Sequence, residues 1–269
     1  MKRIKTTFVY VFLSISSFLS IFPFLWMIIG ATNTSKDVSA GKLTPGTQFL
    51  TNFKNLCSSV DLGRVIGNSV VITVISTILA IVLSSMAGYA FFVFKSKWLD
   101  KVFGVLILSM MIPFAAIMIP LFRLFSQMGL LNSYASVILP SAATAFLIFF
   151  FRQNTESFPL ELIQAARVDG LDEFRIFVKI FMPTMKATYA AAGIITFMNT
   201  WNNFLWPLIA LQTNDKKTLP LIISYLSSAY TPDYGVIMMV IIIATAPTLL
   251  VFFLMQKNFV EGMVGSVKG

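Results

Sequence analysis

The polar side chains whose types and spacing could serve a function are concentrated between residues 159 and 183, in a chain that is 57% hydrophobic. Pro159 can open a helix there, because its missing N–H lies among donors that would be unpaired anyway. Glu161 then falls in the first turn, where the helix dipole favours an anion. Gly170 suits the left-handed position after a helix C-terminus, and Asp172 suits the N-cap of a second short helix. We therefore predict a helix–turn–helix in residues 159–183.

The surface of this segment has two interpretations. The second helix is predicted to be amphipathic, with Arg175 and Lys179 on its polar side. Its apolar residues at helical spacing are Leu171, Phe174, Val178 and Phe181. The basic residues could simply hold the segment against lipid headgroups. Alternatively, the first helix exposes Gln164, Ala165 and Ala166, and such small side chains let the surface of another protein approach the backbone closely.

A second polar group lies in an apolar run nearer the C-terminus: Asn199, Trp201, Asn202 and Asn203. Amides and aromatic faces suit the hydroxyl groups and the apolar ring faces of sugars, so these residues could line a transport pathway. They could equally form hydrogen bonds between helices and part of an aromatic belt at the membrane surface. The sequence leaves both interpretations open.

No residue pattern indicates a catalytic, cofactor-binding or metal-binding site. The chain has no histidine, and no apolar run holds paired carboxylates or a cluster of metal ligands. A G-x-x-x-x-G-K-[ST] phosphate-binding loop is absent, so the chain cannot bind ATP by that route. The single cysteine, Cys57, excludes an intrachain disulfide. We therefore predict a protein that is not an enzyme and binds no cofactor itself.

The fold is predicted to be all-α, as one polytopic membrane domain over residues 1–269. The mean hydropathy is +0.83, only 12% of residues are charged, and apolar runs of spanning length recur. Two prolines, Pro113 and Pro120, are expected to break the third span. The six predicted spans are at about residues 8–31, 65–94, 102–125, 134–151, 185–211 and 235–255. The segment at 159–183 lies between the fourth and fifth spans, and a tail follows at 256–269.

The basic residues set the predicted orientation. Six spans leave both termini on one side of the bilayer, and 13 of the 20 lysines and arginines lie on that side, against seven on the other. By the positive-inside rule, both termini and residues 159–183 are cytoplasmic. The net charge of +9 does not indicate nucleic-acid binding, because the basic residues lie between apolar runs and form no single patch.

Three stretches resemble the permease subunits of binding-protein-dependent ABC importers, most closely the maltose-type, carbohydrate-uptake branch. The pattern P-x-E-x-x-x-AA-x-x-DG, followed by Ile180 and Pro183, resembles the cytoplasmic coupling loop of that family. The family usually has Glu before the two alanines, where this chain has Gln164. W-N-x-F-x-W-P-L resembles the family's fifth span, and residues 259–269 resemble its C-terminal ending at nearly every defined position.

The resemblance implies a function and a set of site residues. The coupling loop would contact an ATPase through Glu161, Gln164, Ala165, Ala166, Asp169, Gly170, Ile180 and Pro183. The tail would contact the ATPase pair through Gly262, Gly265, Val267, Lys268 and Gly269. The chain would be a permease in the bacterial cytoplasmic membrane, forming half of the pathway for a carbohydrate, with a di- or oligosaccharide as the expected substrate. Its implied partners are a second homologous permease, two ATPase subunits that bind ATP and Mg²⁺, and an extracytoplasmic sugar-binding protein.

Three other functions remain as alternatives. An importer of the same branch could carry glycerol phosphate or a polyol. An ion-coupled carrier fits less well, because such carriers usually hold ionisable residues inside the membrane, and the predicted span interiors contain no Asp, Glu, Lys or His. Arg123, near the end of the third span, is the nearest exception. A membrane scaffold that transports nothing is the third alternative.

Overall fold

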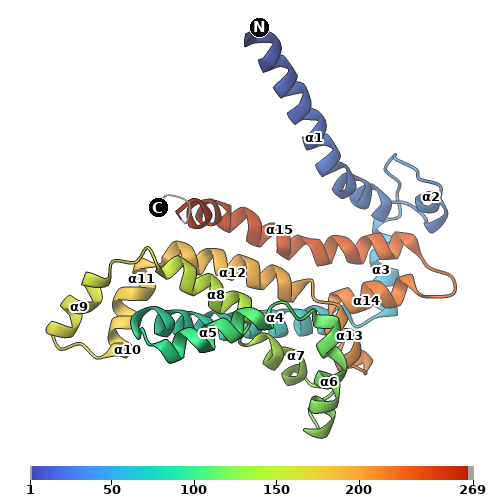
Figure 1. The fold of residues 1–269 in the computed structure, drawn as a ribbon. Coiled ribbons are helices and arrows are strands. Elements are labelled where there is room, and N and C mark those ends of the chain that lie inside the picture. The colour runs from blue at the N-terminus through green and yellow to red at the C-terminus, as the bar shows by residue number, and fades with distance from the viewer. Residues whose placement is uncertain (1, 266–269) are drawn as a thin grey trace. The chain divides into compact units, whose positions relative to one another are not determined.

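The computed structural model describes residues 2–265, which form helices joined by turns and loops and contain no strand (Figure 1). They divide into two compact units. The first unit comprises residues 2–65 and 219–247, and the second comprises residues 66–218 and 248–265. The all-helical fold class is therefore confirmed.

The first unit combines an apolar helix with a folded polar segment. Its helices are α1 (Lys2–Ala31), α2 (Ser35–Ser39), α3 (Phe49–Ser59), α14 (Leu219–Ser227) and the N-terminal part of α15 (Tyr234–Gly265). Large apolar side chains of α1, such as Phe8 and Leu19, are exposed, as suits a helix that faces lipid. The buried Asn52 amide of α3 donates to the backbone oxygens of Ala31 at 2.8 Å and Asn33 at 2.9 Å. These bonds join α3 to the end of α1.

The second unit contains the remaining helices. They are α4 (Leu62–Val93, nearly all of it), α5 (Lys97–Ser109), α6 (Phe114–Gln127), α7 (Tyr134–Ser141), α8 (Ala145–Thr155), α9 (Leu160–Val168), α10 (Glu173–Ile176), the π-helix η1 (Phe177–Phe181), α11 (Met182–Thr184), α12 (Lys186–Trp201), α13 (Leu205–Ala210), the short 3-10 helix η2 (Asn214–Lys216) and the C-terminal part of α15.

A stripe of small and hydroxyl residues makes α4 a packing surface. Thr73, Ser76 and Ser84 are buried along it. A Cβ atom added to Gly88 would lie 2.6 Å from Phe151 Cβ and 2.9 Å from the backbone nitrogen of Arg152. Even a methyl group would therefore push α4 away from α8. Close contact of this kind is typical of helices that pack through small residues in membranes.

The predicted third span is bent. Helix α5 ends at Ser109, α6 begins at Phe114, and the two axes differ by 103°. Pro113 is the N-cap of α6, and a proline disfavours helical backbone in the residue before it. Pro120 lies inside α6 without ending it. The expectation that both prolines break this span is therefore right for Pro113 and wrong for Pro120.

The predicted fourth and fifth spans are also interrupted. The fourth consists of α7 and α8, and the Thr144 hydroxyl caps α8 by accepting a hydrogen bond from Leu147 N. The fifth, predicted at about residues 185–211, contains a break, because α12 ends at Trp201 and α13 begins at Leu205. Pro207 supplies a physical reason. It has no N–H to donate to the carbonyl of Asn203, and its ring would crowd that carbonyl in a continuous helix.

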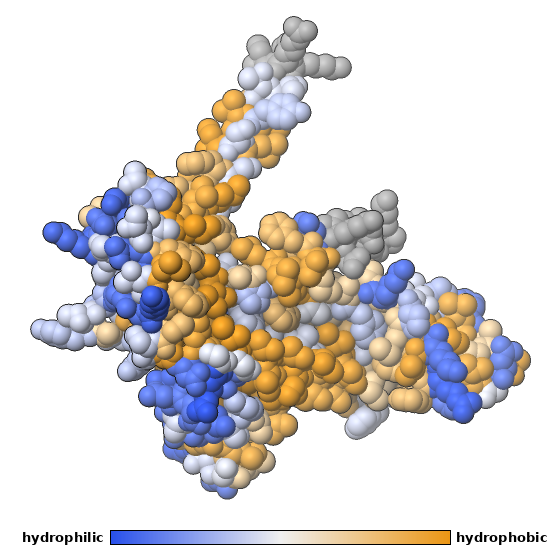
Figure 2. Space-filling view, turned by 180° about the vertical axis from the view of Figure 1, so that it is seen from behind, coloured by the Kyte–Doolittle hydropathy of each residue, from blue (hydrophilic) through white to orange (hydrophobic). Residues whose placement is uncertain are grey.

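Four helical segments within residues 2–265 are long and apolar enough to cross a membrane, and the bent α5–α6 pair makes a fifth if its two helices form one span. They are Thr6–Ala31, Leu62–Val93, Tyr134–Thr155 and Tyr234–Gln256. Figure 2 shows a broad apolar surface over the middle of the second unit, with polar residues gathered at the end formed by α9 and α10. The protein is therefore an integral membrane protein.

Candidate functional site

Helix α9 begins and ends close to where the local sequence predicts. It starts at Leu160, directly after Pro159, and Glu161 is exposed in its first turn. Asp169 is the C-cap, and Gly170 follows with a φ of 81°. A Cβ on Gly170 would meet no atom within 4 Å, so the backbone conformation alone favours glycine here. The predicted left-handed turn is confirmed.

The second helix of the segment also starts as predicted. Asp172 is the N-cap of α10, and its Oδ1 accepts a hydrogen bond of 2.9 Å from Arg175 N. The same carboxylate pairs with Arg175 Nε at 3.1 Å. After Ile176 the chain forms the π-helix η1 and then α11. Residues 159–183 are therefore a helix–turn–helix. Its second arm, from Glu173 to Pro183, changes from α-helical to π-helical geometry after Ile176 and back to α-helical at Met182.

The apolar stripe predicted for the second helix is wrong at two positions. Phe174 is 68% exposed and Val178 is 40% exposed. The buried residues are instead Ile176, Phe177 and Phe181. The ring centroids of Phe177 and Phe181 lie 5.4 and 4.9 Å from that of Tyr89 in α4. Contact with α4 therefore decides which face of this helix is buried.

Ala166 is buried, contrary to the prediction that it is exposed beside Ala165. It belongs to the apolar cluster that contains Ile163, Ile176 and Phe177. Its small side chain leaves room for α9 and the second arm of the segment to approach each other. Ala165 and its neighbour Gln164 are exposed, as predicted. The outer face of α9 is therefore formed by Glu161, Gln164, Ala165 and Val168, which we call the α9 outer face.

The two remaining predicted coupling residues lie at the end of the segment. Ile180, in η1, is half-buried against the same apolar cluster. Pro183, in α11, is exposed. Ile180 therefore helps to hold the segment together, whereas Pro183 is available on its surface.

A polar contact that the sequence did not reveal joins α4 to this segment. The Tyr89 hydroxyl donates a hydrogen bond of 2.9 Å to Glu173 Oε2, and Arg167 Nε donates one of 2.6 Å to Glu173 Oε1. Tyr89 is 84 positions before Glu173, and no local pattern relates two residues so far apart. We call these three residues the Tyr89–Glu173–Arg167 contact.

The charges of this contact stabilise each other. The hydrogen bond from Arg167 holds the pKa of the Glu173 carboxyl below its ordinary value, and the bond from Tyr89 acts in the same direction. The bond to Glu173 in turn raises the pKa of Arg167. Both side chains of the ion pair are about two-fifths exposed, so solvent screens part of the attraction.

The predicted pathway residues lie around the break between α12 and α13. Trp201 is buried, whereas Asn199 and Asn202 are exposed and Asn203 is half-buried. The Asn202 amide donates to Met198 O at 2.9 Å across the last turn of α12. Asn202 and Asn203 line a cavity of about 360 Å³ together with Phe114, Phe204 and Leu205. The structure thus brings the two amides and two aromatic rings to one cavity, but not Asn199 or Trp201.

The C-terminal prediction is only partly within the described residues. Helix α15 continues to Gly265, so Gly262 and Gly265 belong to its last turns. The expected boundary between span and tail at residue 256 is therefore not an end of the helix. Val267, Lys268 and Gly269 lie outside the described residues.

Residues 80–265 match the family model for the binding-protein-dependent transport system inner membrane component. The match spans well over half of the chain. The chain belongs to this family. The predicted family is thereby confirmed, and the protein is a permease, a transport subunit rather than an enzyme.

The permease is similar along almost its whole length to curated proteins. It is 52% identical to the lactose transport system permease protein LacG of Rhizobium radiobacter, over 99% of this chain and 98% of LacG. It is 37% identical to the arabinooligosaccharides transport system permease protein AraQ of Halalkalibacterium halodurans, over 94% and 93%. It is 30% identical to the sn-glycerol-3-phosphate transport system permease protein UgpE of Escherichia coli, over 92% of each.

Solved structures share the fold of the permease. A chain from a bacterial ABC transporter involved in the import of the acidic polysaccharide alginate superposes with a TM-score of 0.86, at 20% sequence identity, over 96% of this chain and 97% of that one. A chain of the MetNI methionine ABC transporter gives a TM-score of 0.57 at 18% identity, over 75% and 95%. At these identities the likeness concerns the fold alone.

Proposed function

We propose that the permease is one of two membrane subunits of an ATP-driven importer for a di- or oligosaccharide. The observation that carries the proposal is the 52% identity, over nearly the whole chain, to a protein that transports lactose. The similarity to an arabinooligosaccharide permease supports the same class of substrate. The partners would be a homologous permease, two ATPase subunits and an extracytoplasmic sugar-binding protein.

The proposed arrangement in the membrane has six spans and cytoplasmic termini. The four long helical segments and the bent α5–α6 pair would supply five of the spans. The broken α12–α13 pair would supply the sixth, because discontinuous helices are tolerated where they line a cavity. The excess of Lys and Arg on the side of residues 159–183 supports a cytoplasmic position for that segment, in the plasma membrane of a bacterium.

The α9 outer face is the proposed contact with the ATPase. Val168 on this face is 88% exposed, and Phe174 nearby in the segment is 68% exposed. An exposed apolar patch with a rim of polar residues is typical of a surface that another protein covers. Ala165, one turn before Val168 in α9, would let that surface come close to the helix. Asp169, Gly170 and Pro183 would hold or extend the contact at its edges.

Movement of the ATPase pair would reach the membrane through this segment. Closure of the pair on ATP would carry α9 with it, and the Tyr89–Glu173–Arg167 contact would transmit the displacement to α4. The transport step is then a shift between inward-open and outward-open populations, driven by the free energy of ATP binding. The C-terminal residues Gly262 to Gly269 would form a second contact with the ATPase pair.

The cavity beside Asn202 and Asn203 is proposed to belong to the sugar pathway. Amides can donate to and accept from hydroxyl groups, and Phe114 and Phe204 can pack against apolar ring faces. Glycerol phosphate, suggested by the similarity to UgpE, fits this cavity less well. Its phosphate would need a cation, and none of the five described residues that line the cavity is charged.

Uptake by the assembled complex tests this function. The complex would be reconstituted in vesicles with its binding protein, and labelled lactose, arabinooligosaccharides, glycerol 3-phosphate and a polyol would be compared. We expect ATP-dependent uptake of a di- or oligosaccharide that a protonophore does not stop. Uptake that halts with the protonophore while ATP stays high would indicate an ion-coupled carrier. A complex that transports none of these compounds and hydrolyses no additional ATP would indicate a scaffold.

A further inference from the structure

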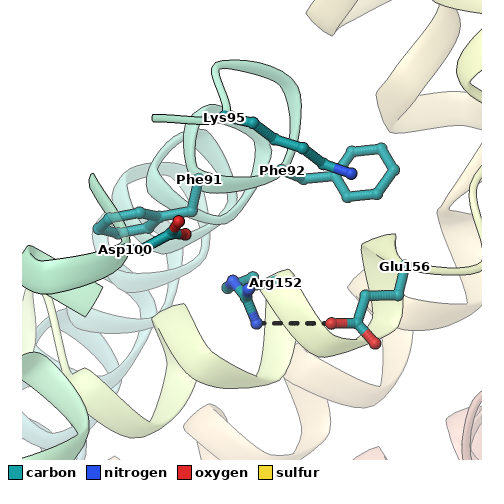
Figure 3. A pocket seen from close by; sticks show the side chains of 6 residues that line it. All are labelled: Phe91, Phe92, Lys95, Asp100, Arg152 and Glu156. Atoms are coloured by element: carbon teal, nitrogen blue, oxygen red, sulfur yellow. Dashed lines mark hydrogen bonds and ion pairs between the residues drawn. The ribbon is translucent and has the colours of Figure 1, made fainter. Parts of the chain in front are cut away.

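A charged cavity of about 290 Å³ lies in the second unit, apart from the α9 outer face and the cavity beside Asn202 and Asn203. It is bounded by the end of α4, the start of α5 and the end of α8. Its lining residues are Phe91, Phe92, Lys95, Asp100, Arg152 and Glu156. Figure 3 shows Arg152 and Glu156 on one wall, facing Lys95, Asp100 and the two phenylalanines.

One pair of charges in this cavity is fixed by the protein. Arg152 Nη1 lies 3.4 Å from Glu156 Oε1, and the Arg152 guanidinium lies 4.2 Å from the centre of the Phe103 ring. Gln153 Nε2 donates to the other Glu156 oxygen at 2.8 Å. The side chains of Arg152 and Glu156 therefore have defined positions at the cavity wall.

The other pair of charges is not satisfied by the protein. The Lys95 ammonium contacts the Phe92 ring, at 5.6 Å from its centre, and has no carboxylate partner within residues 2–265. The Asp100 carboxylate has no side-chain partner in the same residues. The cavity thus presents one unpaired cation and one unpaired carboxylate, in addition to the Arg152–Glu156 pair.

The position of the cavity along the helices corresponds to the level of lipid headgroups. It lies where two candidate spans end, at Val93 and at Thr155. Phe94 is 46% exposed and Trp98 is 70% exposed beside it. Exposed aromatic residues next to the ends of apolar helices are typical of the membrane–water interface. A ligand at this level has its polar part in the cavity and its apolar part along the helices.

We propose that this cavity binds the headgroup of phosphatidylethanolamine. The phosphate would lie against Lys95 and Arg152, and the ammonium group against Asp100 and Glu156. A headgroup that carries one negative and one positive charge matches a cavity with two cations and two carboxylates. Phosphatidylglycerol would satisfy the cations but would leave the Asp100 carboxylate, which has no side-chain partner in the described residues, facing its uncharged glycerol. Charge complementarity therefore selects the zwitterionic lipid.

The test measures lipids retained by the intact complex. The full-length permease, purified with its co-expressed subunits and delipidated, would be titrated with palmitoyl-oleoyl phosphatidylethanolamine or phosphatidylglycerol and examined by native mass spectrometry. The parent should prefer phosphatidylethanolamine. Asp100→Asn and Lys95→Gln should each weaken its binding by about fivefold, since exposed charge pairs contribute up to about 1 kcal/mol. The double variant should show no preference between the two lipids.

A matched control and a competitor distinguish headgroup binding in this cavity from general adhesion of lipid to the protein. Lys97→Gln removes the same charge two residues further on, at the first position of α5, but Lys97 does not line the cavity, so the lipid binding of this variant should equal that of the parent. Excess inorganic phosphate should not displace the lipid. The proposal is overturned if phosphate displaces it, or if the cavity variants keep the parental preference. It is also overturned if the variants lose ATPase subunits instead of lipid, which would make the cavity a protein contact.

Discussion

The Tyr89 hydroxyl, one turn before the end of α4, lies 2.9 Å from Glu173 Oε2 at the start of α10. The ring of Tyr89 packs on Phe177 and Phe181 at the same time. One side chain of a candidate span therefore makes both a polar and an apolar contact with the proposed ATPase-contacting segment. The two contacts can be separated by substitution.

Tyr89→Phe removes the hydroxyl and keeps the ring. We expect a small loss of stability, about 1 kcal/mol, because a hydrogen bond to a partly exposed carboxylate is lost while the apolar packing remains. Sugar uptake should fall more than ATP hydrolysis, because movement of the segment is then less firmly tied to α4. Thermal unfolding and the ratio of sugar transported to ATP hydrolysed would be measured. Tyr230→Phe, at a fully exposed position, is the matched control. An unchanged ratio in Tyr89→Phe would show that the hydroxyl plays no part in coupling.

The lowered pKa of Glu173 should make the stability of the protein depend on pH in a specific way. Arg167 lowers the pKa of Glu173 in the folded protein, so the folded state binds the proton less readily than the unfolded chain. The stabilisation is fully present above the unfolded pKa, about 4.3, and is lost as pH falls through the lower, folded pKa. Glu173→Gln does not titrate and lacks this contribution.

The midpoint of thermal unfolding, followed as pH is lowered from about 6 to about 3, would reveal this contribution. The parent should be more stable than Glu173→Gln at the upper end, and the difference should shrink toward the lower end. Arg167→Gln should reduce the same difference, because it removes the main cause of the shift. A difference that grows as pH falls would contradict the assignment.

The two neighbouring alanines of α9 should respond differently to enlargement. Ala165→Trp adds bulk to the α9 outer face, so the permease should keep its stability and lose co-purification with the ATPase. Ala166→Trp inserts an indole into the packed cluster around Ile163 and should cost about 1–3 kcal/mol of stability or more. Thermal unfolding and co-purification would be measured for both. If Ala165→Trp retains the ATPase and stimulated hydrolysis at parental levels, the α9 outer face is not the coupling surface.

The difference between these alanines shows what local sequence rules can and cannot predict. The Asp172 cap and the left-handed Gly170 depend on a few adjacent residues, and both were predicted correctly. The burial of Ala166 depends on where the second arm of the segment returns, and the exposure of Phe174 depends on the position of Tyr89 in α4. Neither position is determined by residues nearby in the chain.

The membrane spans show the same limit of prediction from local sequence. Apolar length predicted where the long helices lie, because it reflects only the composition of consecutive residues. The 103° bend between α5 and α6 coincides with Pro113, whereas Pro120 is accommodated within α6. The break after Trp201 was missed, although Pro207 lies four residues after Asn203 and could have indicated it. The cavity beside Asn202 and Asn203 lies at that break.

The orientation of the permease can be tested at Cys57. This cysteine is free and exposed at α3, in the segment predicted to be external. A membrane-impermeant maleimide should therefore label it in intact cells whose outer surface is accessible. A cysteine placed at Lys97 in a Cys57→Ser background should be labelled only after lysis. The reverse pattern would mean that the proposed orientation is inverted.

Gly88 and Tyr89 together give α4 the mechanics of a lever. At these adjacent positions α4 makes contact with two other elements. Gly88 has no side chain and so lets α4 pack closely against α8, whereas the hydroxyl and ring of Tyr89 contact the segment at 159–183. A helix rises 1.5 Å per residue, so Ile66 lies about 35 Å along the axis from this fulcrum. A tilt of α4 by about 10° about Gly88 and Tyr89 would move Ile66 by about 6 Å. Movement of this size would convert a small rocking of the proposed ATPase partner into an opening comparable to the width of a sugar ring.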